Sequence, residues 1–303
     1  MKLALVGIGK IALDQHVPAL KASPDWELAA TVSRHGTVEG VEAFTDIAAM
    51  LDARPDIGTV SLCLPPVPRF DAAQAVLRAG RHLMLEKPPG PTLAEVHALC
   101  DLADRQGVTI YATWHSRMAM GVGAARDWLA GRSVQGGRIT WREDVRKWHP
   151  GQDWIFQAGG MGVFDPGINA LSILTEILPE PLRLLSADLD FPANRQAPIA
   201  ARLRFSQNIA ADFDFRQEGP QTWDMELQTD AGLLALRMGG NRLDIDGRPV
   251  QGADDIMGEY PALYAQMARL VAAGKSDADL APMVLVADAF TLGRRNTVAD
   301  FHF

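Results

Sequence analysis

Short apolar runs alternate with longer amphipathic stretches in the first part of this 303-residue chain. Apolar runs of four to six residues have the length of buried strands, and stretches of ten residues or more with apolar positions three and four apart predict helices. Strands are expected at 3–6, 28–32, 59–64, 82–85 and 108–112, and helices up to residue 20 and over 70–79 and 92–106. This alternation predicts an α/β fold with a doubly wound parallel sheet.

The pattern changes near residue 119. A helix is expected over 122–129, and strand-like segments follow with few helices between them. They lie at 137–144, 182–189, 200–205, 209–215, 223–228 and 233–237, and two helices close the chain over 260–273 and 281–294. In the first of these strands Ile139, Trp141 and Glu143 alternate with arginine and threonine, so one sheet face carries Glu143. We therefore expect two domains, 1–118 and 119–303.

The first expected strand leads directly into Gly7-Ile8-Gly9-Lys10-Ile11-Ala12. In a Gly-x-Gly-x-x-Ala pattern, the first glycine permits a tight turn and the second lets the backbone approach a pyrophosphate. The small third residue allows close helix–strand packing, and the helix N-terminus favours the phosphate charge. With a strand before it and a helix after it, the motif predicts dinucleotide binding by residues 7–11.

The second expected strand ends at Ser33-Arg34-His35. NAD-binding folds usually carry an acidic residue here that holds the ribose 2′-hydroxyl, whereas an arginine accommodates a 2′-phosphate. The acidic residue is absent, Ser33 can donate a hydrogen bond and Arg34 can pair with phosphate. The sequence therefore favours NADP as the cofactor over NAD, with an exposed polar turn as the alternative interpretation.

Two further strand ends carry candidate site residues, since ligands bind at the carboxyl ends of strands in such sheets. The strand at 59–64 stops at Leu64-Pro65-Pro66, and the prolines cannot donate to a sheet and so mark an exit loop. The strand at 82–85 delivers Glu86-Lys87-Pro88, and the strand at 108–112 leads to His115. We expect Leu64, the two prolines, Glu86 and Lys87 to lie near the cofactor.

The candidate chemistry of the second domain lies between residues 143 and 169. Trp148 and His149 belong to a polar, aromatic loop, and an indole ring beside hydrogen-bonding groups suits a sugar; a solvated loop with a structural tryptophan is the alternative. Further on, Gly159-Gly160-Met161-Gly162 precedes Asp165-Pro166, which we expect to cap and begin a helix beside a glycine-lined floor. Asp165 and Asn169 would share a face of that helix, which could equally be a capped core helix.

Composition excludes several classes of protein. The net charge of −8 argues against a nucleic-acid surface. Two cysteines are too few for a disulfide framework, and the seven histidines show no metal-ligand spacing, so no metal site is expected. No apolar run reaches membrane-spanning length, and residues 3–6 are too short for the core of a signal peptide, so we expect a cytoplasmic protein.

The motif at 7–12, Pro65-Pro66 and Glu86-Lys87-Pro88 together resemble the glucose–fructose oxidoreductase/inositol dehydrogenase family, and Glu-Lys-Pro is the most specific element. The family usually has a histidine four residues after the aspartate that follows paired glycines, where this chain has Asn169. Together with the runs 143–150 and 159–172, Asn169 makes the chain similar to the bacterial members of this family that oxidise L-arabinose or D-galactose. The resemblance implies a Rossmann domain followed by a substrate-binding domain with a mostly antiparallel open sheet.

The resemblance also implies NAD(P)-dependent oxidation of an aldopyranose, L-arabinose or D-galactose, at C1 to the aldono-lactone. Asp165 or Lys87 would accept the hydroxyl proton; an ordinary aspartate is ionised at pH 7, whereas a lysine would need a pKa well below about 10.4. We therefore expect Asp165 as the base, Lys87 as a charged hydrogen-bond donor and Asn169 as a ligand of a neighbouring hydroxyl. The remaining expected sugar contacts are His115, Glu143, Trp148 and His149.

Two other functions stay open at this point: oxidation of inositol or another sugar within the same family, and a non-catalytic sensor that binds NADP and sugar. A sensor has no need of a base, so the presence of Lys87 and Asp165 favours an enzyme. The expected partner is a small-molecule sugar, without nucleic acid or membrane, and the open sheet face is a candidate surface for a homo-oligomer.

Overall fold

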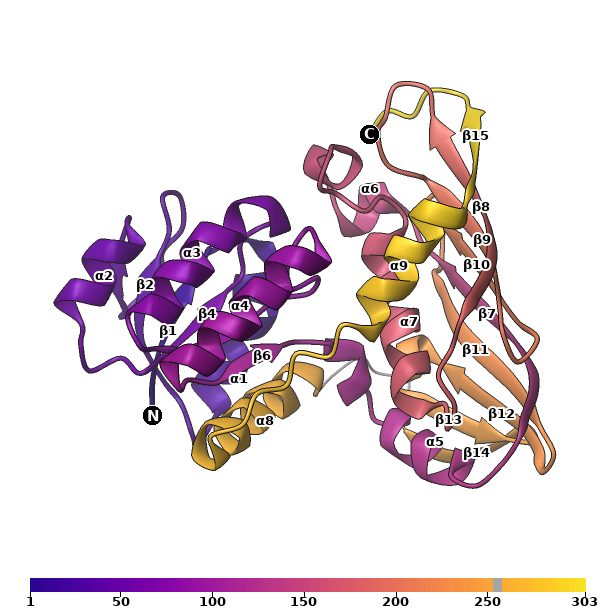
Figure 1. Ribbon diagram of the computed structural model, residues 1–303, viewed down its shortest axis with the longest axis horizontal. Coiled ribbons are helices and arrows are strands. Elements are labelled where there is room, and N and C mark those ends of the chain that lie inside the picture. The colour runs from indigo at the N-terminus through magenta and orange to yellow at the C-terminus, as the bar shows by residue number, and fades with distance from the viewer. Residues whose placement is uncertain (253–257) are drawn as a thin grey trace. The chain divides into compact units, whose positions relative to one another are not determined.

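The computed structural model describes residues 1–252 and 258–303 (Figure 1). The chain forms two compact units, one made of Met1–His115 and Tyr260–Asp279 and the other of Ser116–Glu259 and Leu280–Phe303. The sequence predicted a second domain that runs without interruption from residue 119. The compact units differ from that division because 260–279 packs with the first unit.

A six-stranded parallel sheet forms the centre of the first unit. Its strand order, β3-β2-β1-β4-β5-β6, is that of the dinucleotide-binding doubly wound fold, so the predicted α/β class is confirmed. The strands are β1 Lys2–Val6, β2 Glu27–Val32, β3 Glu42–Phe44, β4 Thr59–Leu62, β5 His82–Leu85 and β6 Ile110–Ala112; the helices are η1 Ala12–His16, α1 Val17–Ala22, α2 Ile47–Ala53, α3 Pro66–Arg78, α4 Leu93–Gln106 and α8 Glu259–Ala273. The sequence pattern missed β3 because this short strand is largely exposed and has no apolar run.

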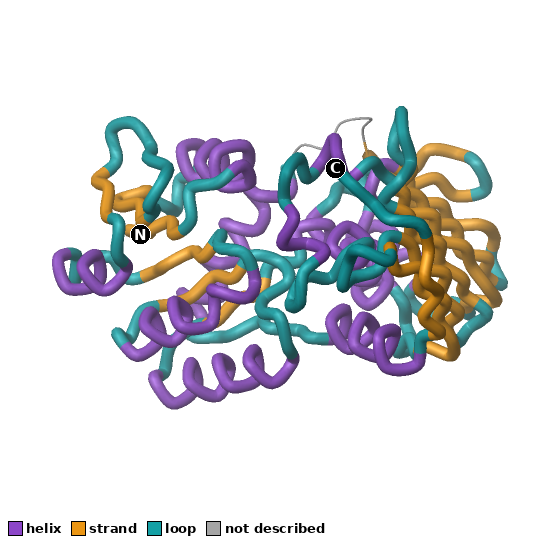
Figure 2. Tube along the Cα trace, turned by 90° about the horizontal axis from the view of Figure 1, so that it is seen from above, coloured by secondary structure: helices purple, strands orange, loops and turns teal. Residues whose placement is uncertain are grey.

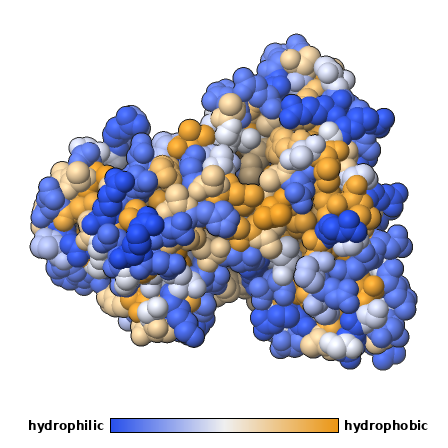
Figure 3. Space-filling view, viewed as in Figure 1, coloured by the Kyte–Doolittle hydropathy of each residue, from blue (hydrophilic) through white to orange (hydrophobic). Residues whose placement is uncertain are grey.

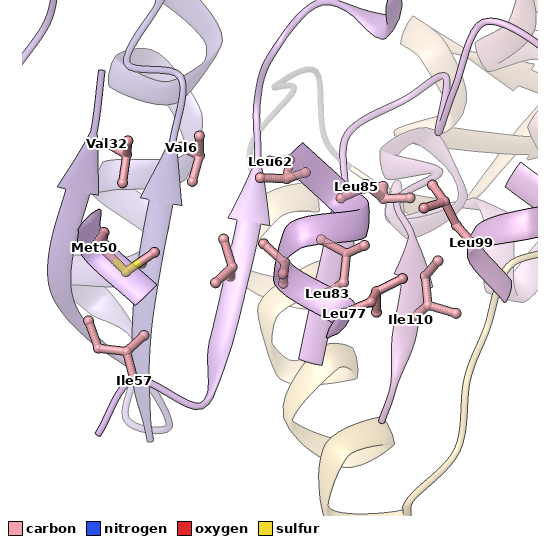
Figure 4. Close-up of a cluster of buried hydrophobic side chains, with 14 of the residues drawn as sticks. Val6, Val32, Met50, Ile57, Leu62, Leu77, Leu83, Leu85, Leu99 and Ile110 are labelled. Atoms are coloured by element: carbon pink, nitrogen blue, oxygen red, sulfur yellow. The ribbon is translucent and has the colours of Figure 1, made fainter. Parts of the chain in front are cut away.

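Apolar side chains fill the space between the first sheet and the helices on one of its faces. Figure 4 shows strand residues meeting Leu77 of α3 and Leu99 of α4, and every labelled side chain is buried. Each such valine or leucine contributes roughly 1.5–3 kcal/mol relative to an exposed position. The strand ends that carry the candidate cofactor residues are therefore held by a well-packed core.

Helix α8 returns to the first unit from far along the chain. Tyr264 is fully buried, and its carbonyl accepts a hydrogen bond from Nε1 of Trp26 at 2.9 Å. Beyond the helix, Asp277 forms a parallel bridge with Tyr111, next to the edge strand β6. These contacts explain why the segment 260–279 belongs to the first unit, although it follows the second sheet in sequence.

A nine-stranded, mostly antiparallel sheet dominates the second unit, as the family resemblance implied. Its order is β14-β13-β12-β11-β7-β10-β9-β8-β15, and only the β7–β10 and β8–β15 pairs are parallel among the described residues. The strands are β7 Val134–Arg142, β8 Leu184–Pro192, β9 Ala200–Phe205, β10 Ile209–Asp214, β11 Thr222–Thr229, β12 Gly232–Arg237, β13 Arg242–Ile245, β14 Arg248–Gly252 and β15 Arg294–Val298. The helices are η2 His115–Met118, α5 Val122–Leu129, α6 Val145–Trp148, η3 Asp153–Phe156, α7 Phe164–Ile177, η4 Met238–Gly240 and α9 Ala281–Leu292.

The two faces of the second sheet differ in character. Helices α7 and α9 pack on each other and on one face, and the strands run side by side in Figure 2. Ile139, Trp141 and Glu143 follow the predicted alternation, and all three are buried. The other face carries part-exposed ion pairs, each worth only about 0–1 kcal/mol, such as Arg142–Asp212 at 2.7 Å and Arg202–Asp190 at 3.0 Å. The covered face therefore supplies the stability.

Hydrophilic residues predominate on the surface drawn in Figure 3, with smaller apolar areas between them. Among the described residues, no helix combines the length and the apolarity needed to cross a bilayer.

Candidate active site

Gly7 directly follows β1 and has the conformation that the glycine motif requires. Its φ is +89°, and a Cβ atom there would lie 3.1 Å from the backbone of Cys63 and Leu64, so glycine is strongly favoured. At Gly9, by contrast, an added Cβ would meet no atom of the described chain within 4 Å. This open space beside the loop backbone suits the close approach of a pyrophosphate. The residues present therefore agree with a bound dinucleotide.

Ser33 organises the turn that follows β2. Its Oγ accepts hydrogen bonds from the backbone N of His35 at 3.3 Å and of Gly36 at 3.1 Å, and Arg34 and His35 are exposed. A Cβ on Gly36 would lie only 2.4 Å from the carbonyl oxygen of Ile8. The turn with the predicted 2′-phosphate ligands thus lies directly against the glycine loop.

Glu86, just after β5, is buried in a polar cluster. Its Oε2 accepts a hydrogen bond from the backbone N of Lys87 at 2.9 Å, and its Oε1 accepts one from the Tyr260 hydroxyl at 3.0 Å. Nε2 of His16 lies 3.0 Å from the same Oε1. Burial alone would raise the pKa of the Glu86 carboxyl, but the hydrogen bond and charge of His16, with smaller contributions from His115 and Lys87, lower this pKa to about 2. Glu86 is therefore an ionised carboxylate that is held in place beside the backbone of Lys87.

A buried arginine joins the end of β4 to the segment around Lys87. Arg69 of α3 is 2% exposed, and its Nε donates to the carbonyl of Leu64 at 3.0 Å. The same guanidinium donates to the carbonyls of Glu86 and Pro88. Pro66 is the first residue of α3 rather than part of an exit loop, because proline is already suited to the first helical position.

Asp165 lies in the first turn of α7 and is not its N-cap, contrary to the prediction. The helix begins at Phe164 with Val163 as its N-cap, because the Val163 carbonyl accepts the first helical hydrogen bond, from the backbone N of Gly167 at 3.1 Å. The Asp165 carboxylate is buried, and its Oδ2 lies 3.5 Å from Nε2 of His149. Negative charge is favourable at this end of a helix. The carboxylate therefore belongs to a polar cluster instead of closing the helix.

His149 lies between two buried carboxylates. Its Nε2 is 3.5 Å from Oδ2 of Asp165 and 3.6 Å from Oε1 of Glu143. The other carboxylate oxygen of Glu143 accepts a hydrogen bond from Nε1 of Trp223 at 2.8 Å, and Trp148 packs against Trp223 with ring centroids 5.1 Å apart. Nε1 of Trp148 is buried, and no hydrogen-bond partner for it occurs among the described residues. The cluster offers acceptors, a donor and apolar rings to a polyhydroxylated ligand.

The glycines before α7 serve the packing of the chain itself. A Cβ on Gly160 would lie 2.3 Å from the carbonyl oxygen of Ile155, and one on Gly162 would lie 2.1 Å from that of Pro198. The expected glycine-lined floor for a ligand is therefore wrong at these two positions, since they are filled by backbone. Asn169 follows one turn after Asp165 and is partly exposed.

The structure gathers the predicted residues in two groups. Glu143, Trp148, His149 and Asp165 meet in the second unit, whereas Lys87, His115 and the predicted cofactor residues belong to the first. The sequence pattern missed Trp223, because its partner Glu143 is 80 residues away and no local pattern links them. It also missed His16 and Arg69. No group of three or more His, Cys, Asp or Glu suited to a metal ion occurs in the described part of the chain.

Comparison with known proteins identifies relatives of the chain. The family model described as "Oxidoreductase family, NAD-binding Rossmann fold" (GFO_IDH_MocA) matches residues 1–113. Galactose 1-dehydrogenase of Pseudomonas fluorescens is 42% identical to the chain, over 100% of this chain and 99% of that protein.

Solved structures give the same picture. The crystal structure of a D-galactose-1-dehydrogenase protein from Rhizobium etli superposes with a TM-score of 0.94 at 53% identity, over 99% of this chain and 97% of that one. A 3-ketoreductase from Actinomadura kijaniata, in complex with NADP and TDP-benzene, shares the fold at 20% identity with a TM-score of 0.82, over 98% of this chain and 99% of that one. The chain therefore belongs to the Gfo/Idh/MocA oxidoreductase family and is an NAD(P)-dependent enzyme with a Rossmann fold.

Proposed function

We propose that this enzyme oxidises an aldopyranose, D-galactose or L-arabinose, at C1 to the aldono-lactone, with NADP as the preferred cofactor. The observation that carries the proposal is the cluster in the second unit, where His149 lies within 3.6 Å of two buried carboxylates beside paired indole rings. Indole rings suit the apolar C–H faces of a pyranose, and the carboxylates suit its hydroxyls. The two relatives named as galactose 1-dehydrogenases support the substrate class.

In the proposed reaction the anomeric hydroxyl loses a proton and C1 loses a hydride, and the sugar becomes a lactone. Bound NADP⁺ supplies the hydride acceptor. Asp165 accepts the proton, Lys87 donates a hydrogen bond that stabilises the developing negative charge on the oxygen, and Asn169 holds a neighbouring hydroxyl. Trp223 holds Glu143 ready to accept a hydrogen bond from the sugar. His115, Trp148 and His149 are the further proposed sugar contacts.

The preference for NADP rests on the turn after β2. Ser33 and the exposed Arg34 lie in a turn that touches the glycine loop, and the segment 33–36 contains no carboxylate to repel a 2′-phosphate. An arginine can pair with that phosphate through two parallel hydrogen bonds. We expect Arg34→Ala to lower kcat/KM for NADP⁺ by about 10-fold or more while changing that for NAD⁺ little, because a hydrogen bond to a charged group is worth about 1.5–3 kcal/mol.

The substrate proposal is tested by initial rates with D-galactose, L-arabinose, D-glucose and myo-inositol, each with NADP⁺ and with NAD⁺. The first two sugars share their ring stereochemistry and differ by a hydroxymethyl group, so we expect their kcat/KM values to agree within about 200-fold. If only myo-inositol were turned over, the proposed aldopyranose substrate would be wrong and inositol would take its place. Binding of NADP⁺ without turnover of any sugar would favour the non-catalytic sensor. A homo-oligomer through the second sheet and a cytoplasmic location stay predictions.

A further inference from the structure

The backbone on both sides of Lys87 is held by one guanidinium. Arg69 donates to the carbonyls of Glu86 and Pro88, which flank Lys87, and its Nε donates to the carbonyl of Leu64 at 3.0 Å. The guanidinium is planar and presents its N–H groups in a rigid fork, so three carbonyls bound to it are fixed relative to one another. Arg69 thus connects Leu64, just after β4, to both neighbours of Lys87 through hydrogen bonds.

The backbone N of Lys87 is held from a second direction. It donates to Oε2 of Glu86 at 2.9 Å, while Oε1 of the same carboxylate contacts the Tyr260 hydroxyl and Nε2 of His16, each at 3.0 Å. Nδ1 of His16 lies 2.7 Å from the Tyr264 hydroxyl. His16 is the last residue of the π-helix that follows the glycine loop, so these contacts link two distant segments of the first unit, η1 and α8, to Lys87.

Stability alone gives little reason for this arrangement. His16 is 0%, Arg69 2% and Glu86 4% exposed. Removing charged groups from water is expensive, and well-packed apolar residues of similar volume are often as stable or more so. A buried polar network does, however, impose one geometry on the groups that it contacts, since each hydrogen bond has a preferred direction and length.

We propose that Arg69 and the His16–Glu86 pair are positioning residues that fix the backbone of Lys87 and so aim its ammonium group at the substrate. This inference rests on the role proposed above for Lys87 as a hydrogen-bond donor to the reacting hydroxyl. Arg69 and His16 act through Glu86 and the backbone of the Glu86–Pro88 segment. The arrangement supplies the supporting layer that a catalytic side chain needs if it is to be held within about 0.5 Å of its productive position.

The test uses the full-length enzyme and the variants Arg69→Met, Arg69→Lys and His16→Gln. Misplacing a catalytic group by about 1 Å costs as much as 10²-fold, so we expect kcat to fall by about 10- to 10²-fold in Arg69→Met, with sugar KM changed much less. Lysine keeps the charge but lacks the fork, so Arg69→Lys should recover only part of the rate. Should Arg69→Met fail to fold, Tyr260→Phe removes a hydroxyl from the same network with almost no change of shape.

His82→Ala is the matched structural control. His82 begins β5, the strand that leads to Glu86, and its Nδ1 accepts a hydrogen bond from the backbone N of Thr109 at 3.0 Å. This variant should lower the unfolding temperature and leave kcat near the wild-type value when assayed well below that temperature. A second readout, which needs neither sugar nor cofactor, is amide hydrogen exchange of the peptide 83–92. When each variant is compared at the same interval below its own unfolding temperature, exchange of this peptide should accelerate more in Arg69→Met and His16→Gln than in His82→Ala.

The outcomes separate the inference from the function on which it rests. In a Lys87→Met background, where the positioned group is gone, Arg69→Met should lower the residual kcat by less than 3-fold. If Arg69→Met lowered kcat by the same factor with and without Lys87, the positioning role would be wrong. A wild-type kcat in both Arg69→Met and His16→Gln would also overturn it. Full turnover in Lys87→Met itself would instead remove the proposed function of Lys87, and the inference with it. Fluorescence titration with NADP⁺ should give dissociation constants close to the wild-type value in the Arg69 variants, since a large change would assign Arg69 to cofactor binding.

Discussion

At the scale of single residues, His16 and Glu86 form a buried pair whose charges make the stability of the first unit depend on pH. Burial by itself lowers the pKa of His16, but its neighbours Cys63 and Tyr264 and its hydrogen bond with Glu86 raise this pKa well above 6.5. The pKa of Glu86 falls from 4.5 to about 2. The Glu86 carboxylate therefore contributes stability that is present above pH 4.5 and is lost as the pH falls towards 2. The contribution of His16 is complete below pH 6.5 and is lost as the pH rises through its raised pKa.

The prediction is that wild type exceeds Glu86→Gln in unfolding temperature most at about pH 5.5, and that the difference shrinks at about pH 3 and again as the pH is raised well above 6.5. Thermal unfolding of both proteins at these pH values provides the measurement. His115, Lys87, Tyr260, Tyr264 and Cys63 also face this pair, and they are the same in both proteins. A difference that is constant over the whole range would contradict the charged pair.

Asp165 permits a second test at this scale. Asp165→Asn keeps the shape of the side chain and removes the base, so turnover should fall by about 10²-fold or more, while NADP⁺ affinity stays the same. Asp144→Asn is the matched control, because Asp144 caps α6 through a 2.9 Å bond from the backbone N of Arg146, and asparagine caps equally well. Initial rates on D-galactose give the comparison. Normal turnover in Asp165→Asn would exclude Asp165 as the base.

At the scale of elements, the contact between α7 and β10 depends on a glycine within the helix. A Cβ on Gly167 would lie 2.5 Å from Cδ2 of Phe213, whereas a Cβ on the exposed Gly123 of α5 would meet nothing within 4 Å. Helix propensity favours alanine by about 1 kcal/mol at both positions. Overpacking at Gly167 costs about 1–3 kcal/mol, so the clash should outweigh the gain there.

We therefore expect Gly167→Ala to be less stable than wild type and Gly123→Ala to be as stable or up to about 1 kcal/mol more stable. Urea unfolding followed by circular dichroism measures both free energies. Because Gly167 lies two residues after Asp165 in the same helix, turnover should fall in Gly167→Ala if the helix moves. Equal stabilisation of both variants would show that α7 can shift away from Phe213 without loss.

At the scale of the whole molecule, the first unit is discontinuous, and this has a consequence for fragments. A fragment that ends at residue 118 lacks Tyr260 and Tyr264, and with them the partners of Trp26, His16 and Glu86. Loss of a large buried aromatic side chain costs roughly 3–5 kcal/mol, which is a large share of the 5–15 kcal/mol that stabilises a typical protein.

The fragment 1–118 should therefore unfold at a clearly lower temperature than the same fragment joined through a flexible linker to 260–279. Thermal unfolding of the two fragments, with and without NADP⁺, provides the measurement. Equal unfolding temperatures would support the boundary that the sequence predicted, with α8 as an accessory of the first unit.

The sequence by itself determined the features that depend on neighbouring residues. The apolar runs and the glycine motif predicted the parallel sheet, the loop at Gly7 and the class of cofactor, because local periodicity and glycine conformation decide them. The alternation in 138–143 assigned Glu143 to the same sheet face as Ile139 and Trp141 for the same reason, and the structure showed that this face is buried. With the family resemblance, the sequence also supplied Glu143, Trp148, His149 and Asp165, four residues that meet in the structure.

Only the tertiary structure decided what depends on contacts between distant segments. In the structure, residues 260–279 belong to the first unit. Asp165 is a partner of His149 rather than a helix cap, and backbone occupies the space beside Gly160. The tertiary structure also joined Trp223 to Glu143 and Arg69 to the carbonyls around Lys87. A local pattern indicates which residues share a face of an element. The partner that packs on that face depends on the tertiary fold of the whole chain, and no single segment contains that information.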